Sequence, residues 1–585
     1  MGSLQTAGRS RAAPRRLLPA LAVFACASAF VVQSPGWAQT SYMALSRALS
    51  DGTARIDRWH WETHDVAWFD GHYYSVKPPG LVFATYPLFA ALDGVGVERV
   101  ARDARIRGES DRGVPWMSRE LPVESYGYDR SRARAAREAI ANDAPLTWAL
   151  GLLGVLVPAL VLLVVLARLV ERVTPGTGVA AALTLAAGTM VLPFSTLYFS
   201  HLLSAALAFG AFALAWRERE GPSRPRVLAV AGVLAGLAVV CEYPLAIAAL
   251  IVGLYAISRR VALVQLPWRA AAYGAGVVAG AAPLLAYQWW AFGSPLHMSY
   301  ANAVAETGFS GHDVLGLNDG GFFGVTAPRI VDGLSLLVGG RGLLTLTPVL
   351  VVAIAGVIAL HREGRHRAET RTVIAIAVAY LLYNAGYWLP FGGGSPGPRF
   401  LIPILPFIAL GLGIAWRRWP AVTLALAAIS MTTMVAATMS YPMIGVNDAG
   451  EWVRRLVDYG SFQHSVLDLA GIAHGPVAIL PFAALVAIAL LLGVRTLGRE
   501  QLALGARFAP PAVLVWALCA TVLPRPLQLP SQEALVLIAT AGMIGLLAVG
   551  VAMRNGRGGA RSPQEEEHHA SARMALEVET AQRTG

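Results

Sequence analysis

The sequence contains almost no lysine. Of its 47 lysine and arginine residues, only Lys77 is a lysine, and every other cationic position in the 585 residues is arginine. A compact ammonium group on a flexible stem suits contact with one phosphate or one carboxylate, whereas the guanidinium fork of arginine has a different geometry. We therefore expect Lys77 to bind an anion, and an incidental surface lysine is the alternative.

Charged residues and cysteines are also scarce. Only 14% of the residues are charged, 55% are hydrophobic, and the mean hydropathy is +0.53, which is typical of a chain whose solvent is mostly lipid. The cysteines Cys26, Cys241 and Cys519 lie far apart in apolar runs, which argues against a disulfide framework and a cysteine zinc site. The net charge of +11 does not indicate nucleic acid, because the arginines fall in short loops between apolar runs.

Apolar runs long enough to cross a bilayer recur along the chain, so we predict an all-α, polytopic integral membrane protein. About 14 transmembrane helices are expected, near 17–37, 145–169, 178–195, 199–216, 226–241, 243–258, 268–292, 342–360, 371–390, 400–416, 419–440, 473–494, 506–523 and 533–553. If these spans alternate, the arginine clusters fall on one face, which the positive-inside rule makes cytoplasmic. These clusters occupy 9–16, 217–226, 259–269, 361–371, 416–419, 495–499 and 554–561.

This alternation defines the expected domain organisation. Residues 1–16 form a cytoplasmic N-terminus, 17–553 a single transmembrane domain, and 554–585 a cytoplasmic tail whose Arg/Gly-rich and then acidic composition predicts disorder. The first span could instead be a signal peptide, since Gly36-Trp37-Ala38 follows it. The lack of a clean small-x-small cleavage site favours an uncleaved anchor.

One apolar run does not fit as a span. If the run from Leu81 to Val97 crossed the membrane, every later loop would be inverted against the arginine pattern. We predict that it is an interfacial helix on the outer surface, as is the segment 42–49. Residues 38–143 then form one large outer loop with two surface helices.

Acidic, histidine and aromatic residues concentrate in this loop between positions 51 and 77. Carboxylates beside tryptophans at a membrane interface can be partly desolvated, which raises their basicity as a general base requires. Aromatics beside carboxylates are also typical of sugar-binding surfaces, and an ordinary hydrated loop is the alternative. His60, Glu62, His64 and Asp65 could be read as metal ligands, but their spacing has no strong signature, so no cofactor is firmly implied.

Two later loops, 293–341 and 391–399, are rich in glycine and end in Arg341 and Arg399. Glycine lets the backbone approach a ligand, and an adjacent arginine can add a bidentate phosphate contact, although a snorkelling arginine at a helix end is equally compatible. No nucleotide fingerprint accompanies these glycines. Glu242, at the turn of a tight helical hairpin, is either a functional ionisable group or a partner in a helix-turn hydrogen bond.

Two motifs resemble a known family. The run Tyr73-Tyr74-Ser75-Val76-Lys77-Pro78-Pro79-Gly80 and the run GGGSPGPRFLIPILPF at 392–407, with the large outer loop, resemble the GT-C superfamily of polyprenyl-phosphate-sugar-dependent glycosyltransferases, and in it a bacterial group of GT-C-like membrane proteins. That superfamily includes the protein mannosyltransferases and the aminoarabinose transferase of lipid A. The likeness covers about 38–407, and Lys77 matches the lysine of the family's KP element, which contacts the donor phosphate.

The family's catalytic aspartate has no clean match. Where it is expected, between the first helix and the first surface helix, this chain has Gln39, Thr40 and Ser41. Either Asp57, ranked slightly ahead, or Asp65 takes the role of catalytic base, or the protein binds without transferring. The resemblance further implies donor-phosphate contacts from Lys77, Arg399 and Arg341, and substrate contacts from Tyr73, Tyr74, His64 and Glu242.

The implied function is transfer of a sugar from a polyprenyl-phosphate donor to a glycan, lipid or protein acceptor on the outer face of the bacterial inner membrane. Basic residues would neutralise the phosphate leaving group, and the aspartate would take a proton from the acceptor hydroxyl. Nucleic acid is not expected as a partner, and membrane lipid is. A transporter or flippase would instead show paired repeats and charges at the bilayer midplane, and a non-catalytic envelope-assembly protein would need neither the lone lysine nor the acidic loop.

The predicted topology can be tested by cysteine labelling. A cysteine at position 120 should react with a membrane-impermeant thiol reagent in intact cells, because it lies in the predicted outer loop. A cysteine at position 365, inside an arginine cluster, should react only after the cells are permeabilised. Labelling of position 365 alone in intact cells would contradict the assignment.

Overall fold

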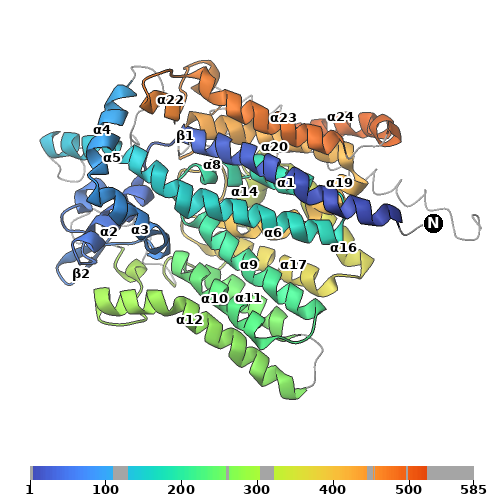
Figure 1. Ribbon diagram of the computed structural model, residues 1–585, viewed down its shortest axis with the longest axis horizontal. Helices are drawn as coiled ribbons and strands as arrows, with labels where there is room; N and C mark the ends of the chain where they lie inside the picture. Colours follow the sequence, from blue (N-terminus) through green and yellow to red (C-terminus); the bar gives the residue numbers. More distant parts are fainter. Residues whose placement is uncertain are drawn as a thin grey trace, which may run out of the picture.

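The computed structural model describes residues 4–109, 130–258, 263–303, 322–443, 452, 455–495 and 499–522. Long helices lie side by side over most of the molecule (Figure 1). Shorter elements gather at one end, which we call the loop end. They include α2 (Trp37–Ser50), the strands β2 (Val66–Phe69) and β3 (His72–Ser75), α3 (Gly80–Gly94) and α4 (Val97–Arg107).

The described helices account for nearly all of the regular structure. The bundle consists of α1 (Leu4–Phe30), α5 (Arg130–Gly151), α6 (Val157–Val173), α7 (Gly178–Gly188), α9 (His201–Glu220), α10 (Pro225–Cys241), α11 (Leu245–Ile257), α12 (Leu266–Phe292), α16 (Val349–Glu363), α17 (Arg367–Gly386), α19 (Leu412–Arg418), α20 (Pro420–Ser440), α23 (Leu480–Val494) and α24 (Arg499–Val522). Short helical pieces connect them: α8 (Val191–Ser195), α14 (Ile330–Val338), α15 (Leu343–Leu346), η5 (Arg399–Ile404), α18 (Leu405–Ile408) and α22 (Val466–Leu469).

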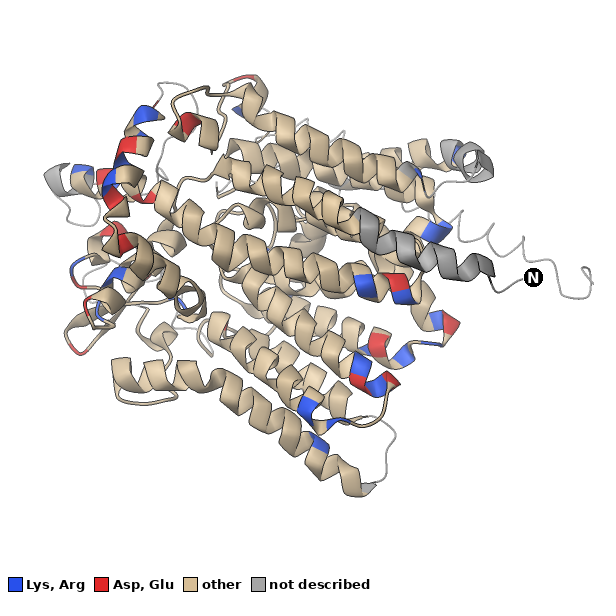
Figure 2. Ribbon diagram, viewed as in Figure 1, with Lys and Arg blue, Asp and Glu red and all other residues tan. Residues whose placement is uncertain are grey.

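The composition of these helices is that of a multi-pass membrane protein. Five described helices are long and apolar enough to cross a membrane, or up to seven if each of two bent pairs counts as one span. Charged residues gather at the two ends of the bundle and leave a largely uncharged belt between them (Figure 2). The expected number of about 14 spans is not confirmed. Several expected spans correspond to shorter apolar helices, and the last one, 533–553, lies outside the described residues.

Glycines let two of the helices pack at very short range. A Cβ added at Gly232 or Gly236 of α10 would come within 2.1 or 2.3 Å of a backbone oxygen of α12. The reverse holds for Gly276 and Gly280 of α12, where the distances to α10 are 2.1 and 2.2 Å. This spacing of small residues brings helix backbones together in membranes. It fixes the α10–α11 hairpin, whose turn carries Glu242, against α12.

The first loop folds into a compact layer at the loop end. The strands β2 and β3 pair in antiparallel register, and Asp70 and Gly71 form the turn with φ values of 49° and 80°. Such a left-handed dipeptide matches the twist of the strands it joins. The segment expected as a surface helix at 42–49 lies inside α2. The segment 81–97 does not run straight, because α3 and α4 meet at 87°.

The C-terminal part of the chain returns to the same end. Strand β1 (Val31–Val32), directly after α1, pairs with β4 (His464–Ser465). Helix α22 follows β4 and packs against α4. The loop end therefore combines the first loop with the segment before α23.

Gly80 fixes where α3 begins. A Cβ at this position would lie 2.7 Å from the backbone nitrogen and from the sulfur of Cys241, at the end of α10. No other residue type leaves room for this contact, since real Cβ atoms do not approach backbone so closely. The glycine at the end of the YYSVKPPG run thus sets the position of Lys77 relative to the helical bundle.

We expect Gly80→Ala to lower the unfolding temperature of the purified protein, because the added methyl group must push α3 away from α10 at a cost of about 1–3 kcal/mol. The matched control is Gly94→Ala in the same helix, where a Cβ would meet nothing within 4 Å. Thermal unfolding in detergent measures both variants. Equal unfolding temperatures for the two would contradict this role of Gly80.

Candidate active site

The single lysine forms an ion pair with one of the two candidate aspartates. The Lys77 Nζ lies 2.8 Å from the Asp65 Oδ2, and the two side chains are only 13% and 12% exposed. Asp65 directly precedes β2 and Lys77 follows β3, so the β2–β3 hairpin brings the two residues together. The sequence alone did not predict this pairing.

Two serines hold the backbones of this pair in place. The Ser41 hydroxyl, on α2, donates to the Asp65 carbonyl oxygen at 2.6 Å and shares a hydrogen bond of 2.8 Å with the Ser75 hydroxyl. The backbone N–H of Lys77 donates to the same Ser75 oxygen at 3.2 Å. Asp65 is therefore tied to the start of α2, the segment in which the family resemblance expected an aspartate.

Two arginines, Arg399 and Arg341, lie in the region of the Lys77–Asp65 ion pair. The Arg399 guanidinium lies over the aromatic ring of Phe199, at 5.2 Å from its centroid, and is close enough to Asp65 for their charges to attract. The Arg341 Nη1 donates to the Gly393 carbonyl oxygen at 3.1 Å, and the charges of the two arginines repel each other. The glycine-rich loop at 392–397 thus wraps around both guanidinium groups.

The glycines of that loop are required by the arginine. A Cβ at Gly392 would lie 2.6 Å from the Arg399 Nε, and Gly392 has a φ of 77°, a conformation that favours glycine. The neighbouring Gly393 has a φ of 95°. The motif expected from the sequence to approach an anion therefore packs directly on an arginine.

The cluster formed by Lys77, Asp65, Arg399 and Arg341 carries an excess of positive charge. Among the described residues, neither arginine forms an ion pair, and the carboxylate of Asp65 attracts Lys77 and Arg399, while Arg341 lies beside Arg399. Partly buried cations without counterions are costly, and an anion that enters the cluster would relieve that cost. Hydroxyl groups are also close, because Tyr42, Tyr300 and Tyr387 all interact electrostatically with Arg399.

Asp57, which the sequence ranked ahead of Asp65, is engaged elsewhere. Its Oδ1 accepts a hydrogen bond from the Tyr73 backbone N–H at 2.7 Å, and its Oδ2 lies 2.8 Å from the His72 Nδ1. The Asp57 side chain is 40% exposed. These contacts fix the edge of the β2–β3 hairpin, and the geometry favours Asp65 as the carboxylate of the cluster.

The expected substrate-binding residues of the first loop mostly pack within it. Tyr73 stacks on His60 with ring centroids 4.1 Å apart, and buried Tyr74 packs against Phe292 at the end of α12, at 4.9 Å. His64 is buried against Trp37, with 4.4 Å between the ring centroids. Within the part of the chain that the structure describes, none of these three side chains forms an ion pair or hydrogen bond with Lys77.

Glu242 is buried at the α10–α11 turn and bonds to the start of α9. Its Oε1 accepts a hydrogen bond from the Ser200 hydroxyl at 3.0 Å and lies 2.6 Å from the His201 Nδ1. The Ser200 oxygen in turn accepts from the Tyr42 hydroxyl at 3.2 Å. His201 stacks on Phe199, and the guanidinium of Arg399 lies over the same Phe199 ring. The hydrogen-bonded network of Glu242 therefore helps to position Arg399.

The first loop does not gather the four residues read as metal ligands. Glu62 lies 3.2 Å from Arg47, Asp65 bonds to Lys77, and the His60 Nδ1 lies 2.6 Å from the Asp57 carbonyl oxygen. Within the described ranges, the group with metal-ligand geometry is a different one, His464, Asp468 and His474.

The sequence analysis missed the residues that support the cluster. Ser75 lies two positions before Lys77 in the YYSVKPPG run, and this spacing is a usable signal, because a hydroxyl there can accept from the backbone two residues later. Phe199, Ser200 and His201 form the second group. The only sequence signal for them is a short polar interruption, Ser200-His201, between two apolar runs.

Comparisons with known proteins gave matches among solved structures alone. No family model matches the sequence, and no curated protein matches it. Among solved structures, the chain is similar to ArnT from Cupriavidus metallidurans in the apo state, with 15% identity, a TM-score of 0.38, and 85% of this chain and 79% of that chain covered. The same protein bound to undecaprenyl phosphate has 13% identity, a TM-score of 0.40 and coverages of 91% and 87%.

An archaeal structure is similar as well. The oligosaccharyltransferase from Archaeoglobus fulgidus in the apo form has 12% identity, a TM-score of 0.34, and 90% of this chain and 64% of that chain covered. Because the TM-scores lie between 0.34 and 0.40, the overlaps are partial, and the function proposed below rests on the contacts of the site itself.

A buried network beside the cluster provides a pH-dependent test. Burial raises the pKa of Glu62 to about 7, and Arg47 offsets this only in part, because Arg47 also binds Asp143 at 2.5 Å. Since the folded-state pKa exceeds the unfolded one, this residue favours folding most below about pH 4.5, and the contribution is lost as the pH rises through about 7.

We therefore expect the unfolding temperature of the Glu62→Gln variant to fall less than that of the wild type when the pH rises from 5 to about 8. Glu98→Gln is the control, because it removes another carboxylate that contacts Arg47 but is 54% exposed. Thermal unfolding across the pH range measures the difference. Parallel curves for wild type and Glu62→Gln would contradict the expectation.

Proposed function

We propose that this protein is a membrane glycosyltransferase that moves a sugar from a polyprenyl-phosphate donor to a cell-envelope acceptor. The observation that carries the proposal is the cluster of three cations and one carboxylate formed by Lys77, Arg399, Arg341 and Asp65. Such a cluster suits a phosphate group whose negative charge grows as the bond to the sugar breaks.

In the proposed reaction, the Lys77–Asp65 ion pair couples the binding of the donor phosphate to the activation of the catalytic base. Without a ligand, the ammonium is held by the carboxylate at 2.8 Å. A donor phosphate would compete for the ammonium, and Arg399 would support the phosphate from its place over Phe199. Asp65, released from the ammonium, is then available to accept a proton.

The chemistry then follows from the positions of these groups. The acceptor hydroxyl attacks the anomeric carbon of the sugar, and the bond between that carbon and the phosphate oxygen breaks, with its electron pair going to the phosphate. Lys77 and the arginines stabilise the charge on this leaving group. Asp65 takes the proton of the attacking hydroxyl.

The location is part of the same proposal. We place the loop end on the outer side of a bacterial inner membrane, because the arginine clusters at 217–226 and 361–371 lie in connections at the opposite end. A lipid-linked donor is already activated and needs no nucleotide site. Its polyprenyl chain would stay in the bilayer while its phosphate reaches the cluster.

The donor-phosphate role of Lys77 can be measured with undecaprenyl phosphate as the probe. We expect Lys77→Ala to weaken binding by about 10- to 100-fold, the usual effect of losing one charge-assisted hydrogen bond, and Lys77→Arg to retain part of it. Arg58→Ala is the control, since this cation of the same loop is 74% exposed and pairs with Asp51. Unchanged binding in Lys77→Ala would contradict the proposal.

The two aspartates should separate binding from chemistry. Asp65→Asn is expected to bind undecaprenyl phosphate at least as well as the wild type, because the competing carboxylate is gone, but to lose transfer by about 100-fold or more. Asp57→Asn, whose carboxylate holds His72 and Tyr73, should retain more transfer. Sugar transfer in membranes containing native donor and acceptor, followed by mass spectrometry, measures this. Full transfer by Asp65→Asn would exclude it as the base.

A further inference from the structure

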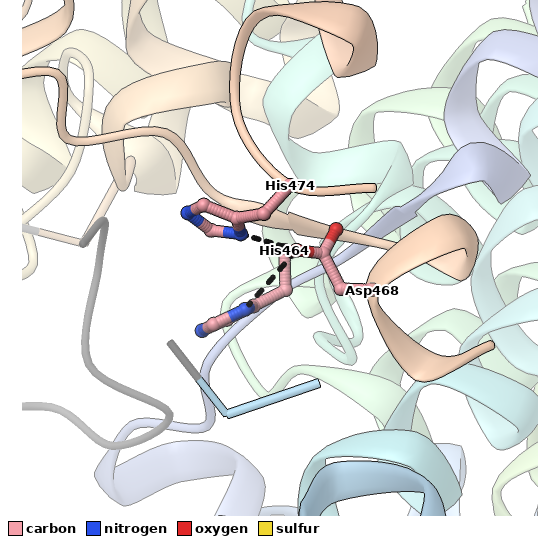
Figure 3. Close-up of side chains that lie close together, drawn as sticks. All are labelled: His464, Asp468 and His474. Carbon is pink, nitrogen blue, oxygen red and sulfur yellow. Dashed lines mark hydrogen bonds and ion pairs between the residues drawn. The ribbon is translucent and has the colours of Figure 1, made fainter. Parts of the chain in front are cut away.

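Two histidines and an aspartate converge in β4 and the segment that follows it. The His464 Nδ1 lies 4.0 Å from the Asp468 Oδ1, and the His474 Nδ1 contacts the same oxygen. One ligand atom from each residue lies within 4.8 Å of the others. Figure 3 shows both imidazole rings directed at the Asp468 carboxylate. None of these residues belongs to the cluster around Lys77.

The carboxylate is oriented by the helix that carries it. The Asp468 Oδ2 accepts hydrogen bonds from the Ser465 backbone N–H at 2.7 Å and from the Ser465 hydroxyl at 2.6 Å, which forms the capping box of α22. The other oxygen, Oδ1, is thereby turned towards the two histidines. Metal-binding carboxylates are commonly held in this way by a second hydrogen-bonded partner.

The donor set and its burial indicate the class of metal. His464 and Asp468 have side chains that are 2% and 1% exposed, and that of His474 is 20% exposed. Two imidazole nitrogens and one carboxylate oxygen suit Zn²⁺ and related divalent transition metals, whereas Mg²⁺ and Ca²⁺ prefer oxygen ligands alone. Ligands of tetrahedral zinc stand about 3.4 Å apart, so small side-chain rotations would bring these three atoms to bonding distance.

We propose that His464, Asp468 and His474 form a binding site for Zn²⁺ or a similar divalent transition metal. Three protein ligands leave a fourth position, which the partly exposed side of His474 leaves open to water. The site lies by α22, which stands apart from β2 in the view of Figure 1.

The metal would brace the C-terminal segment that pairs with β1, the strand directly after the first helix. His464 is paired with Val32 in the β1–β4 ladder, and the apolar side chains of Val466 and Leu469 pack on Ala141 and Ala144 of α5. This ladder is only two residues long in each strand, so hydrogen bonding alone secures it weakly. A metal that joins β4, α22 and the loop at 474 would stabilise this junction.

The site can be tested on the full-length protein, purified in detergent with an affinity tag that contains no histidine. After chelation and dialysis, Co²⁺ serves as a spectroscopic probe, since its visible absorption reports tetrahedral nitrogen and oxygen coordination. We expect saturation at about one Co²⁺ per chain, displacement of Co²⁺ by Zn²⁺, and a rise of the unfolding temperature by about 3 to 5 °C with saturating Zn²⁺.

The variant His474→Ala distinguishes metal binding at this site from nonspecific metal binding elsewhere on the protein. In chelator it should unfold at or somewhat below the temperature of the wild type, because the contact with Asp468 is lost. Zn²⁺ should then add no stabilisation to the variant and should bind it at least 10-fold more weakly than it binds the wild type. His366→Ala is the matched control, because this histidine is also partly exposed, at 24%, and also faces a carboxylate, that of Glu369. Asp468→Asn, which keeps a side-chain oxygen for the Ser465 cap, should behave as His474→Ala does.

Two results would overturn the proposal. One is a wild-type protein that shows no cobalt spectrum and no shift of its unfolding temperature with Zn²⁺. The other is a His474→Ala protein that binds Zn²⁺ as tightly as the wild type and the His366→Ala control. If His474→Ala failed to fold, the Co²⁺ spectrum of the wild type compared with Asp468→Asn would still decide the question.

Discussion

Ionised side chains are costly in hydrocarbon, and this cost organises the whole molecule. Charges gather at the two ends of the helical bundle, and the belt between them is nearly free of them (Figure 2). Where charged groups are deeply buried, they are paired. Arg269 and Glu218, with side chains 1% and 0% exposed, are 2.6 Å apart. Against this background, the described residues around Lys77 are unusual, because one carboxylate, Asp65, stands against more than one cation, and the anion-binding role proposed for them rests on this imbalance.

The loop end concentrates polar chemistry because its elements lock one another in place. The β2–β3 hairpin brings Asp65 to Lys77, Ser41 ties both to α2, and Gly80 sets the start of α3 against α10. Each contact constrains a backbone rather than a flexible side chain. Electrostatic stabilisation of a leaving group requires such preorganised charges, because charges that had to be rearranged during the reaction would give back much of the gain.

Sequence reasoning singled out residues where the signal is local. The YYSVKPPG run marked Lys77, and the glycine-rich run marked Arg399. It ranked the aspartates in an order that the geometry does not favour, because the spacing along the chain does not reveal that Asp57 bonds to His72. No sequence pattern marked His464 and His474 as candidate metal ligands, because histidines in loops follow no periodic pattern.

The sequence by itself determined the class of the protein, since apolar runs and arginine-rich connections are properties of composition that any fold of this chain must satisfy. It also determined which residues are unusual, above all the single lysine. Only the tertiary structure decided which of these residues meet: Lys77 with Asp65 across a hairpin, Arg399 with Phe199 at a separation of 200 positions, and Glu242 with His201. Contacts between distant segments depend on helix packing and turn geometry, and the order of residues alone does not encode those distances in a readable form.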